Sequence, residues 1–219
     1  MPTTYKIGVF DSGIGGLSVA RAIEQALPKH QVLFKNDSQH VPYGARRPAE
    51  ILPLVTPIFA SFMAEGCDVI VVACNTVSTT LINELRVLFT VPMIAMEPMV
   101  KPAAQLTTSK VIAVCATPTT LASARYTELK QLYAKNVTVI EPDCSDWSSL
   151  IEQNDLNHEK IAADLGPAID AGVDVIVLGC THYHWIENEI KQIAQGKAVV
   201  LQPEQAVISQ LQRVLARQP

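Results

Sequence analysis

The amino-acid sequence predicts an α/β fold of two pseudo-symmetric open parallel-sheet domains, with the active site in the cleft between them. Short apolar runs rich in β-branched residues alternate with longer helix-like segments along the 219 residues. Continuous apolar strands separated by helices are typical of a parallel sheet that is covered on both faces. The second half of the chain repeats the pattern of the first, and no Pro/Ser-rich linker interrupts it.

The first half contains four strand-like runs and three helix-like segments. The predicted strands are Tyr5–Phe10, Val32–Phe34, Asp68–Ala73 and Pro92–Ala95. Apolar residues follow helical spacing in three segments. The first is Leu17–Leu27, the second ends near Glu65, and the third is Thr76–Phe89. A loop containing Pro42, Gly44 and Pro48 precedes the second of these helices.

The second half contains an equivalent series. Its predicted strands are Val111–Cys115, Val137–Ile140, Asp174–Leu178 and Val199–Leu201. Helices are expected after the first and third of these strands, and a helical pair is expected over about Ser148–Ala171. A final helix over Glu204–Ala216 is expected to pack back on one of the two halves.

An internal repeat relates the two halves. The sequence GCDVIVVACNT matches AGVDVIVLGCTH, so that Asp68 corresponds to Asp174 and Cys74 to Cys180 at one common offset of 106 residues. Such a repeat indicates two related α/β units. We expect a first domain over residues 1–97 plus about 203–219, and a second domain over residues 98–202.

Composition and charge exclude several classes of protein. The net charge is −4 and the pI about 5.7, and Arg46-Arg47 is the only adjacent basic pair, which argues against a nucleic-acid or anionic-membrane partner. The longest uncharged apolar stretch, Ile51–Ala64, is too short to span a bilayer, and no signal-peptide core precedes the first strand. We therefore expect a soluble, cytoplasmic protein.

The five scattered cysteines have no CxxC pair and are expected to be thiols. Cys67, Cys115 and Cys144 are interpreted as small buried apolar residues. Cys74 and Cys180 differ, because each follows a buried strand and is followed by polar residues that open a helix. Ligands bind beyond the carboxyl ends of the strands in such sheets.

A cysteine in this position still needs help to act as a base. An ordinary thiol has a pKa of about 8.5, and a helix N-terminus contributes only about 1 kcal/mol. Asp11 and His182, at equivalent strand ends, are the candidate partners for Cys74 and Cys180. Two such groups across a cleft suit a reaction in which one removes a proton from carbon and the other returns it to the opposite face.

Four motifs carry a resemblance to a known family. They are IGVFDSGIGGLSV (Ile7–Val19), VPYG (Val41–Gly44), ACNT (Ala73–Thr76) and LGCTHY (Leu178–Tyr183). Their order and spacing resemble the glutamate racemase family, within the aspartate/glutamate racemase superfamily. The match also takes in Asp37, Glu97-Pro98 and the segment ATPTTLASARY from Ala116, and so covers most of the chain.

The resemblance implies a site and an activity. Cys74 and Cys180 would be the catalytic pair, assisted by Asp11 and His182, without pyridoxal phosphate or metal. Substrate-binding groups would come from Asp11, Ser12, Pro42, Tyr43, Gly44, Asn75, Thr76, Thr117, Thr120, Thr181 and His182. The substrate would be glutamate, and the product, D-glutamate, would supply peptidoglycan synthesis in a bacterium. Members of the family commonly dimerise, so a homodimer is also expected.

Other interpretations stay open at this point. DSGIGG is a candidate phosphate loop, although it lacks the G-x-G-x-x-G register, and Cys180, His182 and His184 are poorly spaced for zinc. The chain departs from the family pattern in its short second half, in the segment DCSDWSSLIEQ where the family has an LVE-type sequence, and in His184 where proline is usual. Racemisation of aspartate or another amino acid is therefore the alternative activity, and a weakly active binding or regulatory paralogue is the alternative class.

Overall fold

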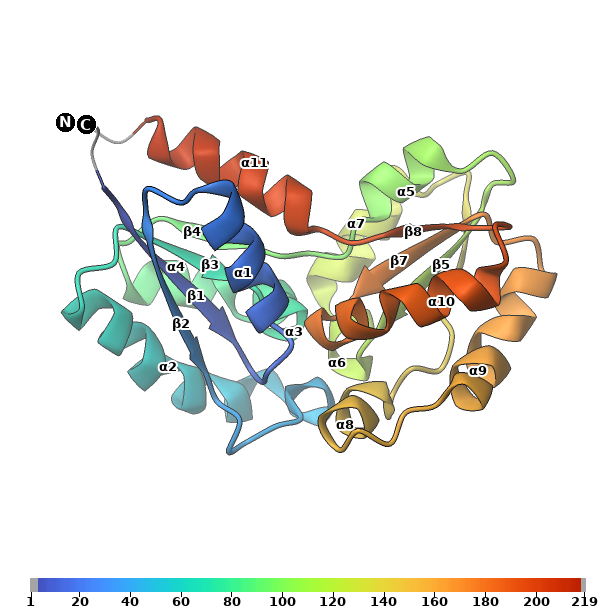
Figure 1. Ribbon diagram of the computed structural model, residues 1–219, viewed down its shortest axis with the longest axis horizontal. Coiled ribbons are helices and arrows are strands. Elements are labelled where there is room, and N and C mark those ends of the chain that lie inside the picture. The colour runs from blue at the N-terminus through green and yellow to red at the C-terminus, as the bar shows by residue number, and fades with distance from the viewer. Residues whose placement is uncertain (1–3, 218–219) are drawn as a thin grey trace.

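The computed structural model describes residues 4–217 and contains two lobes, each built on a four-stranded parallel sheet (Figure 1). The strand order is β2-β1-β3-β4 in the first sheet and β6-β5-β7-β8 in the second. The two sheets have the same topology, so the predicted α/β fold with two pseudo-symmetric parallel sheets is confirmed. We call the part built on β1–β4 the first lobe and the part built on β5–β8 the second lobe.

The first lobe contains the N-terminal elements. Its strands are β1 (Lys6–Asp11), β2 (Gln31–Asn36), β3 (Val69–Val72) and β4 (Met93–Ala95). Its helices are α1 (Leu17–Ala26), the 3-10 turn η1 (Tyr43–Ala45), α2 (Pro48–Ala64), α3 (Asn75–Thr80) and α4 (Ile82–Leu88).

The second lobe repeats this arrangement. Its strands are β5 (Val111–Ala116), β6 (Thr138–Ile140), β7 (Val175–Gly179) and β8 (Val199–Leu201). Its helices are α5 (Val100–Leu106), α6 (Pro118–Leu121), α7 (Ala124–Tyr133), α8 (Trp147–Glu152), α9 (His158–Asp170), the 3-10 helix η2 (Thr181–Ile186) and α10 (Glu187–Ala194).

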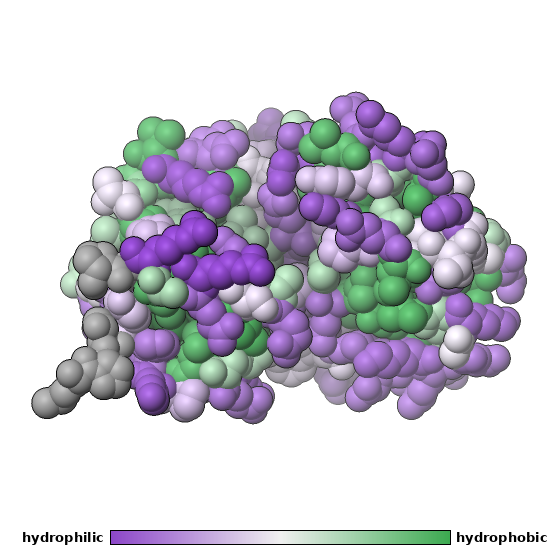
Figure 2. Space-filling view, turned by 90° about the horizontal axis from the view of Figure 1, so that it is seen from above, coloured by the Kyte–Doolittle hydropathy of each residue, from purple (hydrophilic) through white to green (hydrophobic). Residues whose placement is uncertain are grey.

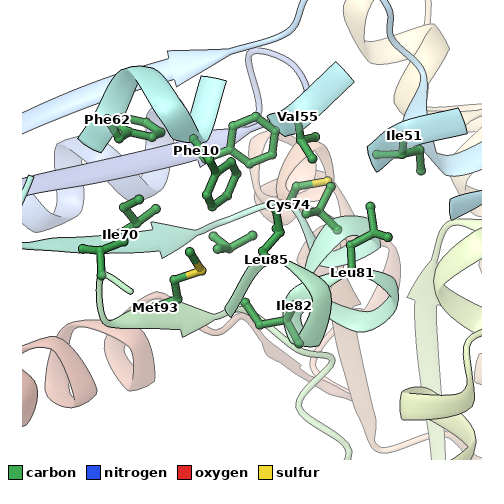
Figure 3. Close-up of a cluster of buried hydrophobic side chains, with 14 of the residues drawn as sticks. Phe10, Ile51, Val55, Phe62, Ile70, Cys74, Leu81, Ile82, Leu85 and Met93 are labelled. Atoms are coloured by element: carbon green, nitrogen blue, oxygen red, sulfur yellow. The ribbon is translucent and has the colours of Figure 1, made fainter. Parts of the chain in front are cut away.

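The central strands β3 and β7, one in each sheet, bury alternate side chains on opposite faces, as the period of a β-strand requires. Ile70 and Val72 of β3 pack with Phe10 and Leu85 in one cluster, and Cys74 belongs to the same cluster (Figure 3). Val69 and Val71 face a second cluster on the other side of the sheet. In β7, Ile176 and Leu178 share a cluster with Cys180 in the same way. The repeat therefore places both cysteines on equivalent faces.

One helix differs from its prediction. The continuous apolar spacing over Thr76–Phe89 predicts a single helix, but the structure has α3 and α4, separated at Leu81. The hydroxyls of Thr79 and Thr80 donate to backbone oxygens one turn back, on Asn75 and Thr76. Such side-chain bonds compete with the helical ladder and account for the short α3.

The last helix, α11 (Glu204–Leu215), returns to the first lobe (Figure 1). Val207, Ile208 and Leu211 pack in the buried cluster that contains β1 and β3 side chains. The domain boundaries stay a prediction, and this packing supports placing the last helix with the first domain.

The surface seen from the side of α11 carries mainly hydrophilic side chains with scattered apolar ones, and a furrow separates the lobes (Figure 2). Within residues 4–217, no helix combines the length and the apolar character needed to cross a bilayer.

Candidate active site

The candidate site lies where the carboxyl ends of the central strands of both sheets meet. In each sheet the strand order reverses between the two central strands, and such a switch point leaves room for a ligand beyond the strand ends. Ser12 follows β1 and Cys74 closely follows β3 in the first lobe. Thr117 follows β5 and Cys180 follows β7 in the second. The fold thus presents four polar or thiol side chains to one region.

A cavity of about 110 Å³ occupies this region between the lobes. Both lobes supply its wall, from the ends of β1, β3, β5 and β7, from η1, and from α8. The lining residues are Ser12, Val41, Pro42, Tyr43, Gly44, Cys74, Asn75, Thr76, Thr117, Ser148, Ser149, Glu152, Gln153, Cys180, Thr181 and His182.

Cys74 stands at the N-cap of α3 and is only 4% exposed. Its Sγ–H donates a hydrogen bond to Ser12 Oγ at 3.5 Å. Burial, followed by the negative charge of Asp11, raises the pKa of the Cys74 thiol to about 12, although the hydrogen bond to Ser12 acts in the opposite direction. Cys74 therefore keeps its proton at neutral pH and is suited to donate it.

Cys180 stands at the N-cap of η2, and its Sγ lies 3.7 Å from His182 Nδ1. Burial alone would lower the pKa of His182, but the hydrogen bond and charge of Cys180, the charge of Asp11 and the hydrogen bond to Glu152 outweigh it and raise this pKa to about 10. His182 is therefore an imidazolium beside the Cys180 sulfur. The ring lies within hydrogen-bond distance of the Cys180 sulfur, so Cys180 and His182 form a pair that is suited to proton transfer.

Glu152 is a site residue that the sequence did not reveal. Its Oε1 accepts a hydrogen bond from His182 Nε2 at 2.7 Å and from the backbone N–H of Ile14 at 3.1 Å. It comes from α8, in the segment DCSDWSSLIEQ that stands where the family has an LVE-type sequence. The position of this segment in the family pattern was the only signal in the sequence that could have pointed to Glu152. The other lining residues absent from the sequence prediction are Val41, Ser148, Ser149 and Gln153.

Asp11 does not line the cavity but contacts residues that surround it. Its carboxylate accepts the N–H of Gly16 at 2.9 Å, the N–H of Gly13 at 3.3 Å and the hydroxyl of Thr181 at 3.2 Å. Burial raises the pKa of Asp11, and the positive charge of His182 opposes that rise. Asp11 thus fixes the loop after β1 and places negative charge near the imidazolium.

Three threonines connect the two lobes beside the cavity. Thr76 Oγ1 lies 3.0 Å from Thr117 Oγ1 and 3.4 Å from Thr120 Oγ1. Thr117 Oγ1 donates to Thr120 Oγ1 at 3.0 Å. Thr120 lies outside the lining, like Asp11, whereas the remaining residues predicted for the site all line the cavity.

Two lining residues differ in how their polar groups are satisfied. The Asn75 side chain is buried, and neither its Nδ2 nor its Oδ1 has a hydrogen-bond partner in the structure. Tyr43, in contrast, donates its hydroxyl to Asp37 Oδ2 at 2.5 Å. Burial and the adjacent carboxylate raise the pKa of Tyr43, so it stays neutral. An unpaired buried amide that lines a cavity is suited to bind a polar ligand group.

His184, which departs from the family pattern, makes its contacts outside the cavity. Its Nδ1 lies 3.4 Å from Glu204 Oε1 at the start of α11 and 3.5 Å from Ser18 Oγ in α1. His184 therefore connects η2 to the first lobe.

The arrangement as a whole places a protonated thiol and a thiol–imidazolium pair around one small cavity. Environments that differ in this way assign an acid role to one group and a base role to the other. Within the described ranges, no cluster of three or more His, Cys, Asp or Glu residues has a geometry that could hold a metal ion. The raised pKa of Cys74 and the contact between Cys180 and His182 make the site suited to proton transfer by its own side chains.

Comparison with known proteins gives a consistent picture. The family model described as Asp/Glu/Hydantoin racemase matches residues 7–211. The chain is 41% identical over 215 residues to the glutamate racemase of Stutzerimonas stutzeri (strain A1501), covering 96% of this chain and 81% of that protein. It is 39% identical over 216 residues to the glutamate racemase of Methylococcus capsulatus (strain ATCC 33009 / NCIMB 11132 / Bath), covering 96% of this chain and 79% of that protein.

Solved structures are similar over nearly the whole chain. Escherichia coli glutamate racemase in complex with L-glutamate and the activator UDP-MurNAc-Ala has a TM-score of 0.90 and 28% identity, with 99% of this chain and 84% of that chain covered. Glutamate racemase from Francisella tularensis subsp. tularensis SCHU S4 in complex with D-glutamate has a TM-score of 0.81 and 25% identity, with 97% and 81% covered.

Proposed function

The chain belongs to the Asp/Glu/hydantoin racemase family, and from this premise we propose that it interconverts L-glutamate and D-glutamate without a cofactor. The observation that carries the proposal is the pair of buried thiols in one cavity, Cys74 with a raised pKa and Cys180 beside the His182 imidazolium. Racemisation needs one group that removes the α-proton and another that supplies a proton from the opposite side.

The proposed reaction is two proton transfers at the α-carbon. The Cys180 thiolate removes the α-proton, and the electron pair of the broken C–H bond moves into the α-carboxylate. The Cys74 thiol then donates its proton to the opposite face, which leaves a Cys74 thiolate and a Cys180 thiol. The reverse sequence converts the other enantiomer.

His182 and its partners stabilise the charges of this cycle. The imidazolium offsets the charge of the Cys180 thiolate, and Glu152, bonded to His182 Nε2, holds the ring in place. On the other side, Ser12 accepts the Cys74 S–H and Asp11 disfavours a second anion there. The two thiols thereby have different surroundings before the substrate binds.

The polar groups of the wall suit an amino acid with two carboxylates. Asn75 offers an unpaired amide, and Thr76, Thr117 and Thr181 offer hydroxyls on both sides of the cavity. The α8 side chains Ser148 and Ser149 add two more hydroxyls to the wall. Each of these groups can bond to a carboxylate or an ammonium.

The proposal is tested by following glutamate in deuterated water. Incubation with L-glutamate should give D-glutamate and deuterium at the α-carbon, measured by chiral chromatography and mass spectrometry. Aspartate and other amino acids run in parallel identify a different substrate preference. A folded protein that exchanges no α-proton in glutamate or aspartate would overturn the proposal.

The roles of the thiols are tested separately. Cys74→Ala and Cys180→Ala should each abolish racemisation, because each removes one of the two proton-transfer groups. Cys115→Ala is the matched control, since Cys115 is also buried but lies in β5 outside the cavity lining. Equal loss of activity in all three variants would indicate a folding defect and remove the support for specific roles.

The wider setting is also a proposal. The D-glutamate would supply peptidoglycan synthesis in a bacterial cytoplasm, and rescue of a D-glutamate auxotroph by the gene would test that role. A homodimer is expected from the family resemblance, and sedimentation measures the assembly directly.

A further inference from the structure

The segment 41–47, which we call the lip, is joined to the second lobe through one side chain. The lip contains η1 and contributes Pro42, Tyr43 and Gly44 to the cavity wall. Among residues 4–217, its only hydrogen bonds to the second lobe come from Thr119 Oγ1, which lies 2.8 Å from the Gly44 carbonyl oxygen and 3.1 Å from the Arg46 carbonyl oxygen. The hydroxyl has a single proton, so the two carbonyls share it.

The lip also borders the mouth of the cavity. Of the residues that line the cavity, only Pro42 and Gln153 are exposed. Pro42 belongs to the lip and Gln153 directly follows α8. The exposed part of the cavity wall is therefore formed by the lip and the end of α8, and the position of the lip bears on access to the two buried thiols.

The lip lies as close to the second lobe as its backbone allows. A Cβ atom added to Gly44 would be 2.5 Å from Thr117 Cβ, which is well inside van der Waals contact. Steric contact therefore limits how far the lip can close. The hydrogen bonds that hold it there come from the Thr119 hydroxyl, and within the described residues the lip makes no other hydrogen bond to the second lobe.

We propose that Thr119 is a positioning residue, whose hydroxyl holds the lip against α6 and thereby fixes the closed form of the cavity around the substrate. Thr119 itself does not line the cavity and takes no part in proton transfer. Its effect is on substrate retention. The kinetic part of this inference rests on the proposed racemisation, whereas the position of the lip does not.

The test compares Thr119→Val, which keeps the shape and removes the hydroxyl, with Thr119→Ser, which keeps the hydroxyl. Loss of a hydrogen bond of ordinary net strength should raise KM for glutamate about three- to tenfold, with kcat changed less than twofold. Thr119→Ser should restore the KM of the original protein. Thr127→Val is the matched control, because the Thr127 hydroxyl bonds to Ser123 within the second lobe at 3.2 Å.

A second measurement needs no turnover. Alkylation of Cys74 and Cys180 by iodoacetamide, followed by peptide mass spectrometry, should be faster in Thr119→Val than in the original protein or in Thr127→Val. If Thr119→Val does not fold, Thr119→Ala replaces it. Unchanged KM and unchanged alkylation rates would overturn the role of Thr119. Absence of α-proton exchange in the original protein would instead overturn the proposed function, and alkylation would still test the lip.

Discussion

Glu152 Oε1 lies 2.7 Å from His182 Nε2, and the same oxygen accepts the N–H of Ile14 at 3.1 Å. One carboxylate from α8 thus connects the imidazolium beside Cys180 to the loop that follows β1. Because hydrogen bonds to charged groups are stronger than neutral ones, this contact both orients the ring and stabilises its charged form.

Glu152→Gln should lower the pKa of His182, because the hydrogen bond to Glu152 is one of the contributions that raise this pKa, after those of Cys180 and Asp11. The imidazolium then loses its proton at lower pH, and the alkaline limb of the kcat/KM profile moves toward neutrality. We expect kcat to fall about 10- to 100-fold, below the full effect of about 10²- to 10⁴-fold for a group that transfers a proton itself. Rates over pH 6 to 10 measure both effects.

The matched control for Glu152 is Glu159→Gln, an exposed glutamate in the first turn of α9. Its pH profile should coincide with that of the original protein. A Glu152→Gln profile that also coincides would mean that the carboxylate has no part in the charge of His182.

Asn75→Ala should separate stability from substrate binding. The buried amide has two polar atoms without partners, which costs stability in the empty protein. We expect the free energy of unfolding, measured with urea, to be unchanged or to increase by up to about 1 kcal/mol. KM for glutamate should rise at least about tenfold. A loss of stability with unchanged KM would contradict a ligand-binding role for this amide.

Gly44→Ala should weaken substrate binding through a steric clash. The new Cβ would lie 2.5 Å from Thr117 Cβ, so the lip must move away from the second lobe. We expect KM to rise by at least about tenfold, because a displaced lip loses its ordered contacts with the substrate. Ala45→Ser, at the exposed neighbouring position, should leave KM unchanged. Similar KM values in both variants would show that the lip accommodates a side chain at Gly44.

Glu204→Gln should affect stability in a pH-dependent way. The hydrogen bond from His184 lowers the pKa of Glu204, and burial opposes this. A lowered folded-state pKa stabilises the protein above the ordinary value of 4.5, and the gain is lost as pH falls below it. We expect the variant to be less stable at pH 7 by up to about 1 kcal/mol, and the difference to shrink at pH 4.

Urea unfolding at the two pH values measures this difference, and Glu24→Gln, an exposed residue of α1, is the control. Activity at pH 7 should be unchanged, since neither Glu204 nor His184 lines the cavity. An equal stability difference at both pH values would contradict a role for the ionised Glu204 carboxylate in this contact.

The sequence predicted the strands and the placement of the central thiols because both depend on local pattern. DVIVVAC and DVIVLGC each alternate buried faces, so Ile70 and Ile176 specify where Cys74 and Cys180 must lie. The period of two residues predicts the face on which each strand ends, and Cys74 and Cys180 follow within two residues of those ends.

The features that the sequence did not predict depend mainly on contacts between side chains and on parts of the chain that are distant in sequence. Glu152 meets Ile14 across 138 residues, and no local spacing connects α8 to the loop after β1. The break at Leu81 depends on the hydroxyl bonds of Thr79 and Thr80, which compete with a helix that the apolar spacing favours. His184 has its partner, Glu204, on a helix that returns from the end of the chain.

The return of α11 to the first lobe means that the backbone passes between the lobes twice. The first passage follows β4 and the second follows β8, and residues from both, including Met96, Pro98 and Pro203, line one cavity on the molecule. Because residues of both passages line one cavity, the two connections lie close together, and two adjacent connections restrain the relative movement of the lobes more than a single one would.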